Sequence, residues 1–188
     1  MKNTRVWLWV TIVVVVIGVA LAVFYAGRGG VSSTATQTAE QSGVSQGRTA
    51  PEFTAATNQG YFDLSKTPKP VFLEVFATWC PHCQRETAVI DQLYQRYKNQ
   101  VAFVAVSGNN TSMDRQGQSS EQDVLTFVQD FHVRYPSAFD GSLDVAHKYL
   151  QAGFPTMVLI DRNKTVAYVT SGETPYSELD SAIRSVLR

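Results

Sequence analysis

The sequence predicts an α/β domain over residues 50–188, preceded by an apolar segment and a polar linker. Three observations lead to this prediction. Strand-like and helix-like patterns alternate throughout the region. Two apolar runs, residues 71–77 and 101–106, have the length of strands that are buried on both faces of a sheet. Between them, apolar residues recur at helical spacing, so strand, helix and strand form one unit whose crossover we expect to be right-handed.

Residues 7–26 form an uncharged run of about twenty residues, which is long enough to cross a hydrocarbon core of about 30 Å. Lys2 and Arg5 precede the run, and a basic start favours a cytoplasmic N-terminus. We therefore predict a single-pass anchor in the cell membrane at residues 7–26, with residues 1–6 in the cytoplasm and the C-terminal domain extracytoplasmic. A cleaved signal peptide is the alternative, because Ala20–Ala22 resembles a small-x-small cleavage site. Both interpretations export the domain.

Residues 27–49 are rich in Gly, Ser, Thr, Ala and Gln, with hardly a large apolar side chain. Such a composition cannot bury enough surface to offset the entropy lost on ordering. We expect a flexible linker between the anchor and the domain.

The chain carries 16 Lys and Arg residues and 16 Asp and Glu residues, so its formal net charge is zero. Beyond the short basic start, the sequence has no cluster of basic residues. This balance argues against a nucleic-acid partner. We expect a monomer.

The first predicted element of the domain is a β-hairpin. Residues 52–57 and 61–64 flank the turn sequence Asn58-Gln59-Gly60, which is typical of a hairpin. The two buried strands come next, and the helix between them begins after Pro81, a residue that suits the first helical turn.

A long polar loop at residues 107–120 follows the second buried strand. Because it leaves the C-terminal end of that strand, we expect it to rim the active face. Two further helices are predicted, at residues 121–131 and at residues 142–150 with Ser142 as N-cap. A hairpin of strands 156–160 and 165–170 follows, and Thr174-Pro175 opens the last helix.

Cys80 and Cys83 are the only cysteines in the chain, and they lie at the junction of the strand at 71–77 with the helix. This placement puts the first sulfur near the helix N-terminus, where free N–H groups and the helix dipole favour a thiolate, the reactive form. The two-residue spacing lets Cys83 attack a mixed disulfide formed at Cys80. The pair therefore predicts thiol–disulfide chemistry.

Two other interpretations of the cysteine pair are open. A structural disulfide that closes so short a loop would remove little entropy from the unfolded chain. A tetrahedral zinc site needs four ligands, and only His82, His132 and His147 are available, at no recognisable spacing. We therefore expect redox chemistry with no metal and no cofactor, and we expect His132 and His147 to be surface or packing residues.

The segment Trp79-Cys80-Pro81-His82-Cys83 follows an apolar strand, and Gly153-Phe154-Pro155-Thr156 lies about seventy residues further on. Together these motifs resemble the thioredoxin superfamily. A tethered domain that begins Ala50-Pro51-Glu52-Phe53 is similar to the TlpA/ResA-like branch of membrane-anchored, extracytoplasmic thiol-disulfide oxidoreductases. The resemblance covers the whole exported domain. It implies a thioredoxin-like fold, a central mixed β-sheet flanked by helices, and several members of this branch serve cytochrome c maturation.

The resemblance implies catalytic roles for two acids. Glu74 stands where thioredoxins carry a buried acid beneath the second cysteine; burial should raise its pKa and fit it to accept the Cys83 proton. The alternative is a carboxylate that faces solvent or is neutralised by a lysine such as Lys69. Glu86 matches a second acid of the branch, in the first turn of the helix, where a glutamate is also ordinary on dipole grounds.

The resemblance also implies a set of substrate-contacting residues. Phe154-Pro155 resembles the cis-proline loop that faces the cysteine pair and pairs with an extended substrate segment. A proline that merely begins a strand is the alternative. Trp79 either shields the sulfurs or packs in the core. Pro81 and His82, between the cysteines, complete the set.

The direction of electron flow rests on conflicting features. Pro81-His82 is the dipeptide of the strong oxidant DsbA, whereas the TlpA/ResA-like pattern implies a reductant. Only about seventy residues separate Cys83 from Pro155, which leaves no space for the large helical insertion of DsbA. We predict that the domain reduces or exchanges protein disulfides, with electrons from a membrane thiol-disulfide carrier. The alternatives are a DsbA-like net oxidant and a thioredoxin-like copper chaperone, although such chaperones resemble C-x-x-x-C with a distant histidine.

Overall fold

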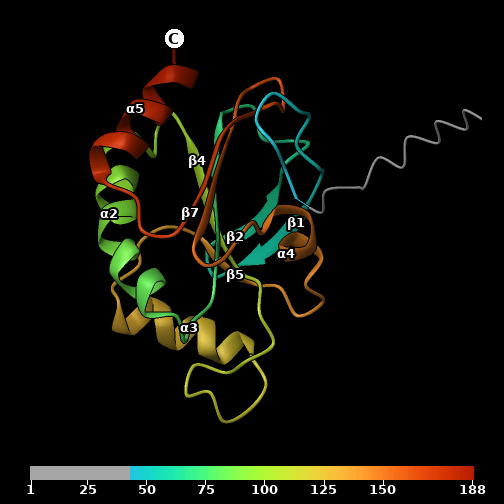
Figure 1. Cartoon of the computed structure of the whole chain (residues 1–188), viewed down its shortest axis with the longest axis vertical. Helices are drawn as coiled ribbons and strands as arrows, with labels where there is room; N and C mark the ends of the chain where they lie inside the picture. The colour runs from blue at the N-terminus through green and yellow to red at the C-terminus, as the bar shows by residue number, and fades with distance from the viewer. Residues whose placement is uncertain (1–42) are drawn as a thin grey trace, which may run out of the picture. The chain divides into compact units, whose positions relative to one another are not determined.

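One mixed sheet of seven strands organises residues 43–188, the part of the chain that the computed structural model describes (Figure 1). The strand order is β2-β1-β5-β4-β3-β6-β7. The predicted mixed sheet with flanking helices and an N-terminal hairpin is confirmed. Along the chain the elements are β1 (Thr54–Thr57), β2 (Gly60–Asp63), β3 (Val71–Phe76), α2 (Pro81–Tyr97), β4 (Ala102–Ser107), α3 (Glu121–Asp130), β5 (Ser137–Phe139), α4 (Asp144–Tyr149), β6 (Thr156–Ile160), β7 (Val166–Ser171) and α5 (Tyr176–Val186).

The predicted anchor at residues 7–26 and the predicted cytoplasmic residues 1–6 lie outside the described residues, as does most of the predicted linker. Within residues 43–188, no helix combines the length and the apolar character that crossing a membrane requires. The anchor therefore stays a prediction.

The last residues of the predicted linker are described, and they pack on the domain. Val44 is buried. The Gly47 N–H donates to the Val166 carbonyl at 2.8 Å, and Thr49 forms an antiparallel bridge with Thr165. The packed region therefore includes residues that the sequence assigns to the linker.

Strand β3 lies at the centre of the sheet, parallel to β4 on one side and antiparallel to β6 on the other, and all of its residues are buried. Phe72 and Phe76 belong to the hydrophobic cluster that also contains Cys83, whereas Leu73 packs in the cluster on the opposite face. Because side chains alternate along a strand, Glu74 points to the same face as Phe72 and Phe76. The sheet therefore directs this carboxylate toward the cysteines.

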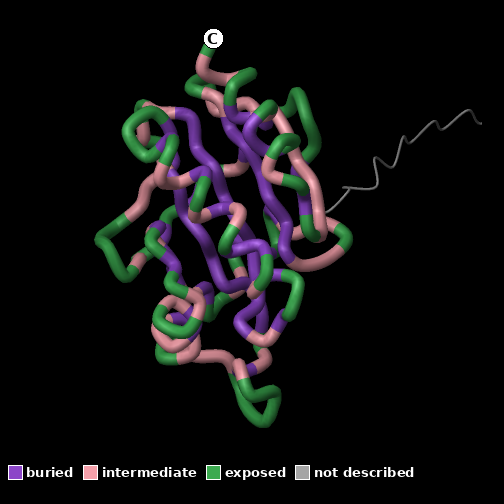
Figure 2. Tube along the Cα trace, turned by 90° about the vertical axis from the view of Figure 1, so that its left-hand side faces the viewer, coloured by how far each residue is buried: buried purple, intermediate pink, exposed green. Residues whose placement is uncertain are grey.

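Helices cover both faces of the sheet. Figure 1 shows α2 and α5 together on one side and α4 on the other. The cluster on the α2 side draws on α2, α3 and α5, and the cluster on the other side includes residues of α4. Figure 2 shows the buried strands running through the middle of the domain. Apolar burial on both faces is the main favourable contribution to the stability of this arrangement.

Strand β5 is the element that the sequence does not reveal. It has three residues, too few for an alternating pattern to register. It pairs in parallel with β4, and Ala138 pairs with Thr57 of the hairpin, so β5 joins the hairpin to the central strands. The start of α5 also differs slightly, because Pro175 is the N-cap residue and not part of the first turn.

The start of α4 corrects a further prediction. The N-cap residue is Leu143, in a left-handed conformation with φ 60°, and not Ser142. The Asp140 carboxylate instead accepts hydrogen bonds from the backbone N–H groups of residues 144–146, at 2.9 to 3.0 Å. Two carboxylate oxygens can accept from several donors at once, which one serine hydroxyl cannot do as well.

We expect Asp140→Ala to lower the free energy of unfolding by about 1–2 kcal/mol, because three N–H groups at the start of α4 lose their acceptor. Urea denaturation followed by circular dichroism measures the change. Ser142→Ala is the matched control and should change stability by less than about 0.5 kcal/mol. A larger loss for Ser142→Ala than for Asp140→Ala would restore the serine as the cap.

Candidate active site

Both cysteines lie where β3 passes into α2. Cys80 is the N-cap residue of α2, and Pro81 occupies the first helical position. The Cys80 N–H donates to the Ala77 carbonyl at 3.0 Å, and the Gln84 N–H donates to the Cys80 carbonyl at 3.1 Å. Both thiols are free; Cys80 is 4% exposed and Cys83 is 0% exposed. The predicted placement of Cys80 at a helix N-terminus is confirmed.

The loop before β6 faces the cysteine pair, as predicted. The peptide bond between Phe154 and Pro155 is cis. The Cys80 thiol donates to the Phe154 carbonyl oxygen, with the sulfur 3.8 Å from that oxygen. Pro155 also stands directly before β6, which begins at Thr156. The loop thus brings a backbone carbonyl group next to the sulfur of Cys80.

Glu74 is 1% exposed. The Tyr135 hydroxyl donates to its Oε2 at 3.2 Å, while Oε1 has no hydrogen-bond partner in the described part of the chain. Burial is the main cause that raises the pKa of Glu74 to about 8; the Tyr135 hydrogen bond opposes this rise and the charge of Glu86 adds to it. Lys69 does not neutralise the acid, because its Nζ reaches the Lys98 carbonyl at 3.5 Å. The predicted buried acid is confirmed.

The charge of Glu74 acts on the protonation of Cys83. Burial is the largest cause of the raised pKa of the Cys83 thiol, and the negative charge of Glu74 raises that pKa further. The thiol therefore keeps its proton at neutral pH until a base removes it. A buried carboxyl group whose pKa is about 8 suits that task.

Glu86 corrects a detail of the prediction, since it lies in the second turn of α2 and the first turn has no acidic residue. It is 2% exposed, and the Thr174 N–H donates to its Oε2 at 3.2 Å. Burial raises the pKa of Glu86 to about 7, the Thr174 bond opposes the rise, and the charge of Glu173 adds to it. The effect of the helix dipole falls off within the first turn, so a dipole role alone does not account for a glutamate in the second turn.

Trp79 connects the cysteine turn to the long polar loop at residues 107–120. Its indole N–H donates to Asn109 Oδ1 at 2.8 Å. Arg115 donates from Nη2 to the Trp79 carbonyl at 3.2 Å, and its guanidinium carbon lies 4.9 Å from the indole centroid. Trp79 also packs edge-on against Phe154, with ring centroids 6.2 Å apart. The loop therefore rims the candidate site, as predicted.

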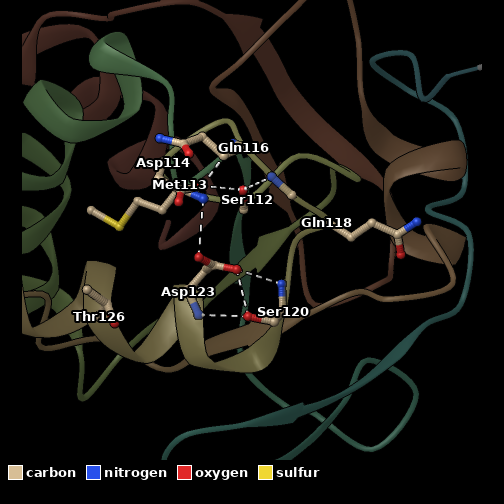
Figure 3. A pocket seen from close by; sticks show the side chains of 9 residues that line it. Ser112, Met113, Asp114, Gln116, Gln118, Ser120, Asp123 and Thr126 are labelled. Atoms are coloured by element: carbon tan, nitrogen blue, oxygen red, sulfur yellow. Dashed lines mark hydrogen bonds between the residues drawn. The ribbon is translucent and has the colours of Figure 1, made fainter.

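The same loop is anchored on α3 by Asp123, as Figure 3 shows. The Asp123 carboxylate accepts from the Met113 N–H at 3.2 Å and from the Ser120 N–H and hydroxyl at 2.8 and 2.6 Å. No cysteine lies in the pocket beside these bonds, so we place the candidate site elsewhere. The pocket, of about 610 Å³, is lined by Ser112, Met113, Asp114, Gln116, Gly117, Gln118, Ser120, Asp123 and Thr126.

His82 forms a charged cluster with Arg85 and Glu173 on the surface. Its Nδ1 lies 2.6 Å from Glu173 Oε1, and Arg85 Nε lies 3.0 Å from the same oxygen. Hydrogen bonds from Arg85, and then from His82, lower the pKa of Glu173 to about 2. The charge of Cys80 contributes to the raised pKa of Arg85, after the larger effect of Glu173. The guanidinium of Arg85 is therefore close enough to Cys80 for the two groups to interact electrostatically.

A groove of about 470 Å³ opens between this cluster and the cis-proline loop. It places the predicted substrate-contacting residues His82 and Phe154 along one surface. Arg85, Glu173, Tyr135, Asn109 and Arg115 were not predicted, because they approach the site from distant parts of the chain or from its surface. The groove is lined by His82, Ala152, Gly153, Phe154, Ser171, Gly172 and Glu173.

His132 and His147 are exposed side chains. Among residues 43–188, no group of three or more His, Cys, Asp or Glu side chains is arranged to hold a metal ion. The described residues therefore give the zinc interpretation of the cysteine pair no set of ligands.

Known proteins are similar to this chain over most of its length. The Redoxin family matches residues 45–183. Thiol-disulfide oxidoreductase ResA of Geobacillus kaustophilus (strain HTA426) is 29% identical over 150 residues, which cover 78% of this chain and 81% of the relative. Thioredoxin-like protein YneN of Bacillus subtilis (strain 168) is 25% identical over 165 residues, or 87% of this chain and 93% of YneN.

A solved structure agrees with these relatives. The dsbF protein of MTB, solved in mixed oxidized and reduced forms, superposes with a TM-score of 0.60 and 26% identity, and the match covers 73% of this chain and 99% of dsbF. Fold, cysteine turn and relatives lead to the same assignment. The chain belongs to the Redoxin family, as a TlpA/ResA-like protein disulfide oxidoreductase of the thioredoxin superfamily.

Proposed function

We propose that this chain is an extracytoplasmic oxidoreductase, held to the cell membrane by residues 7–26, that reduces or exchanges protein disulfides through Cys80 and Cys83. The observation that carries the proposal is the unequal placement of the two sulfurs. Cys80 is 4% exposed and caps the helix, and its sulfur lies 3.8 Å from the carbonyl oxygen of Phe154, which lines the groove. Cys83, in contrast, is 0% exposed and is under the electrostatic influence of the buried acid Glu74. One sulfur can meet a substrate, and the other can only finish the reaction.

The reaction proceeds in two displacements. In the first, the Cys80 thiolate attacks one sulfur of the substrate disulfide, and the other substrate sulfur leaves with the electron pair. In the second, Cys83 passes its proton to Glu74 and attacks Cys80, which forms the Cys80–Cys83 disulfide. The remaining substrate sulfur leaves as a thiolate and takes a proton from water. The cysteine pair loses two electrons, and the substrate disulfide gains them.

The reduction potential tests the direction of net flow. We expect a value nearer to the −270 mV or so of thioredoxin than to the −120 mV or so of DsbA, because a buried Glu74 suits a thioredoxin-type resolving step. Equilibration of the protein in glutathione buffers, followed by mass measurement of trapped thiols, gives this potential. A value near that of DsbA would make the protein a net oxidant, which the Pro81-His82 dipeptide favours.

Reduction outside the cytoplasm needs electrons from inside, because exported proteins meet an oxidising compartment. We propose that a membrane thiol-disulfide carrier reduces the Cys80–Cys83 disulfide after each turnover. We further propose that the substrates include the C-x-x-C-H haem-attachment segments of c-type cytochromes. The support is the likeness to the TlpA/ResA-like branch.

We expect an oxidised C-x-x-C-H peptide to be reduced at least about tenfold faster than a peptide of the same composition with its cysteines further apart, since a factor of ten needs only about 1.4 kcal/mol of selective binding. Stopped-flow measurement of peptide thiol release gives both rates. Equal rates would indicate a general protein disulfide reductase and would contradict the cytochrome proposal.

A further inference from the structure

Tyr135, two residues before β5, gives Glu74 the side-chain hydrogen bond described above, from its hydroxyl to Oε2 at 3.2 Å. Both residues are 1% exposed, and within the described residues Glu74 Oε1 has no partner. We propose that Tyr135 is a positioning residue that fixes one carboxylate oxygen of Glu74 and leaves the other free to take the Cys83 proton. This inference rests on the proposed function.

The register of the sheet explains why a residue so distant in sequence reaches Glu74. Glu74 of β3 pairs with Ala105 of β4, and Ala105 pairs with Ser137 of β5. Tyr135 precedes Ser137 by two residues, so alternation directs it to the same face. Strands lie about 4.8 Å apart, so the tyrosine side chain must extend over β4. Ala105 carries only a methyl group there, which leaves room for the ring.

The tyrosine is held as firmly as its role requires. Its ring packs edge-on against Tyr94, with centroids 6.2 Å apart and an interplanar angle of 64°. Its carbonyl accepts from the Ser137 hydroxyl at 3.2 Å. Burial, and then the charge of Glu74, raise the pKa of Tyr135 well above its ordinary value. The hydroxyl therefore remains a hydrogen-bond donor throughout the working pH range.

The other ionisable groups around this pair are acidic. Glu86 of α2 raises the pKa of Glu74, the charge of Glu74 raises the pKa of Cys83, and the charge of Asp91 of α2 raises the pKa of Tyr135. Among the groups that act on Glu74, Tyr135 is the one that lowers its pKa. Loss of the hydroxyl should therefore make Glu74 hold its proton to higher pH, so that less of the base form is available at neutral pH.

Tyr135→Phe tests the inference, because it removes the hydroxyl and keeps the ring. The reduced full chain is mixed with a labelled peptide disulfide from about pH 5 to pH 10, and stopped-flow fluorescence records release of the second peptide fragment. We expect the midpoint of the release rate to move upward by about one pH unit, with release at pH 7 slowed about tenfold and the high-pH plateau unchanged. In a Glu74→Gln background the same substitution should have no further effect on the pH profile.

Tyr97→Phe is the matched control. The Tyr97 hydroxyl also donates to a carboxylate in the interior, Asp180 Oδ1 at 2.6 Å, but it lies at the opposite end of α2 from the cysteines. This variant loses the same kind of bond and should keep the wild-type midpoint. An upward shift of equal size in Tyr97→Phe would identify a general loss of packing and would overturn the inference.

The remaining outcomes distinguish failure of the inference from failure of the proposed function. A folded Tyr135→Phe variant with the wild-type midpoint would overturn the inference alone. Equal release by the wild type and by Cys83→Ala would overturn the proposed function, and the inference with it. If Tyr135→Phe does not fold, 3-fluorotyrosine at position 135 alone makes a stronger donor in the same ring. The inference then requires a downward shift of the midpoint, and an unmoved midpoint would overturn it.

Discussion

Replacing Cys83 by alanine should stop multiple turnover and leave substrate attached to Cys80 through a stable mixed disulfide. The resolving attack is intramolecular, and well-oriented neighbouring groups reach effective concentrations that solution thiols cannot match. We expect turnover to fall by roughly 10³-fold or more. Intact-mass measurement under non-reducing conditions should show the protein plus one substrate chain, and dithiothreitol should release that chain.

Cys80→Ala is the control for this trap. It should be equally inactive, yet it should form no adduct, because the remaining sulfur, Cys83, is 0% exposed. Adduct formation at Cys83 in this variant would contradict the assigned order of attack. So would turnover by Cys83→Ala at the wild-type rate.

Glu74→Gln should make the protein more stable than the wild type at about pH 8.5 and equally stable at pH 4. The folded state raises the pKa of Glu74 from 4.5 to about 8, so folding favours the protonated acid. That contribution is complete below the unfolded pKa and is lost as the pH rises through the folded pKa. At about 1.4 kcal/mol for each unit of pKa, the loss amounts to as much as about 5 kcal/mol. Glutamine is neutral at every pH, so the Glu74→Gln variant does not undergo this loss of stability.

Urea denaturation at a series of pH values measures this difference. The gap between variant and wild type should open between about pH 5 and pH 8. Glu86→Gln provides a graded comparison, because the pKa of Glu86 rises only to about 7 and its gap should be smaller and complete at lower pH. Parallel stability curves for the wild type and Glu74→Gln would show that Glu74 is charged in the folded protein at neutral pH.

The central part of the fold follows from local sequence signals. Two continuous apolar runs predict β3 and β4, and the cysteine turn with Pro81 predicts the start of α2. The resemblance in Phe154-Pro155 leads to the cis peptide bond. For β3, β4 and the cysteine turn the local pattern and the tertiary structure agree, so local signals are sufficient there, whereas the cis bond needed the family resemblance.

The missing parts depend on contacts between distant segments. Strand β5 is too short for a pattern, and without it nothing in the sequence brings Tyr135 across the sheet to Glu74. Glu173 and Arg85 meet only because the end of β7 returns to the start of α2. The Asp140 cap of α4 was missed because a serine stood nearer to the expected helix start. Local propensity does not carry these tertiary relations.

The complete burial of Cys83 determines how partner proteins can react with the cysteine pair. A partner protein that donates electrons and one that accepts them must both react at the sulfur of Cys80. Substrate and electron donor therefore cannot bind at the same time. Neither can form an unproductive mixed disulfide with Cys83. Steady-state rates measured against both partners should follow a ping-pong pattern, in which each partner at high concentration competes with the other.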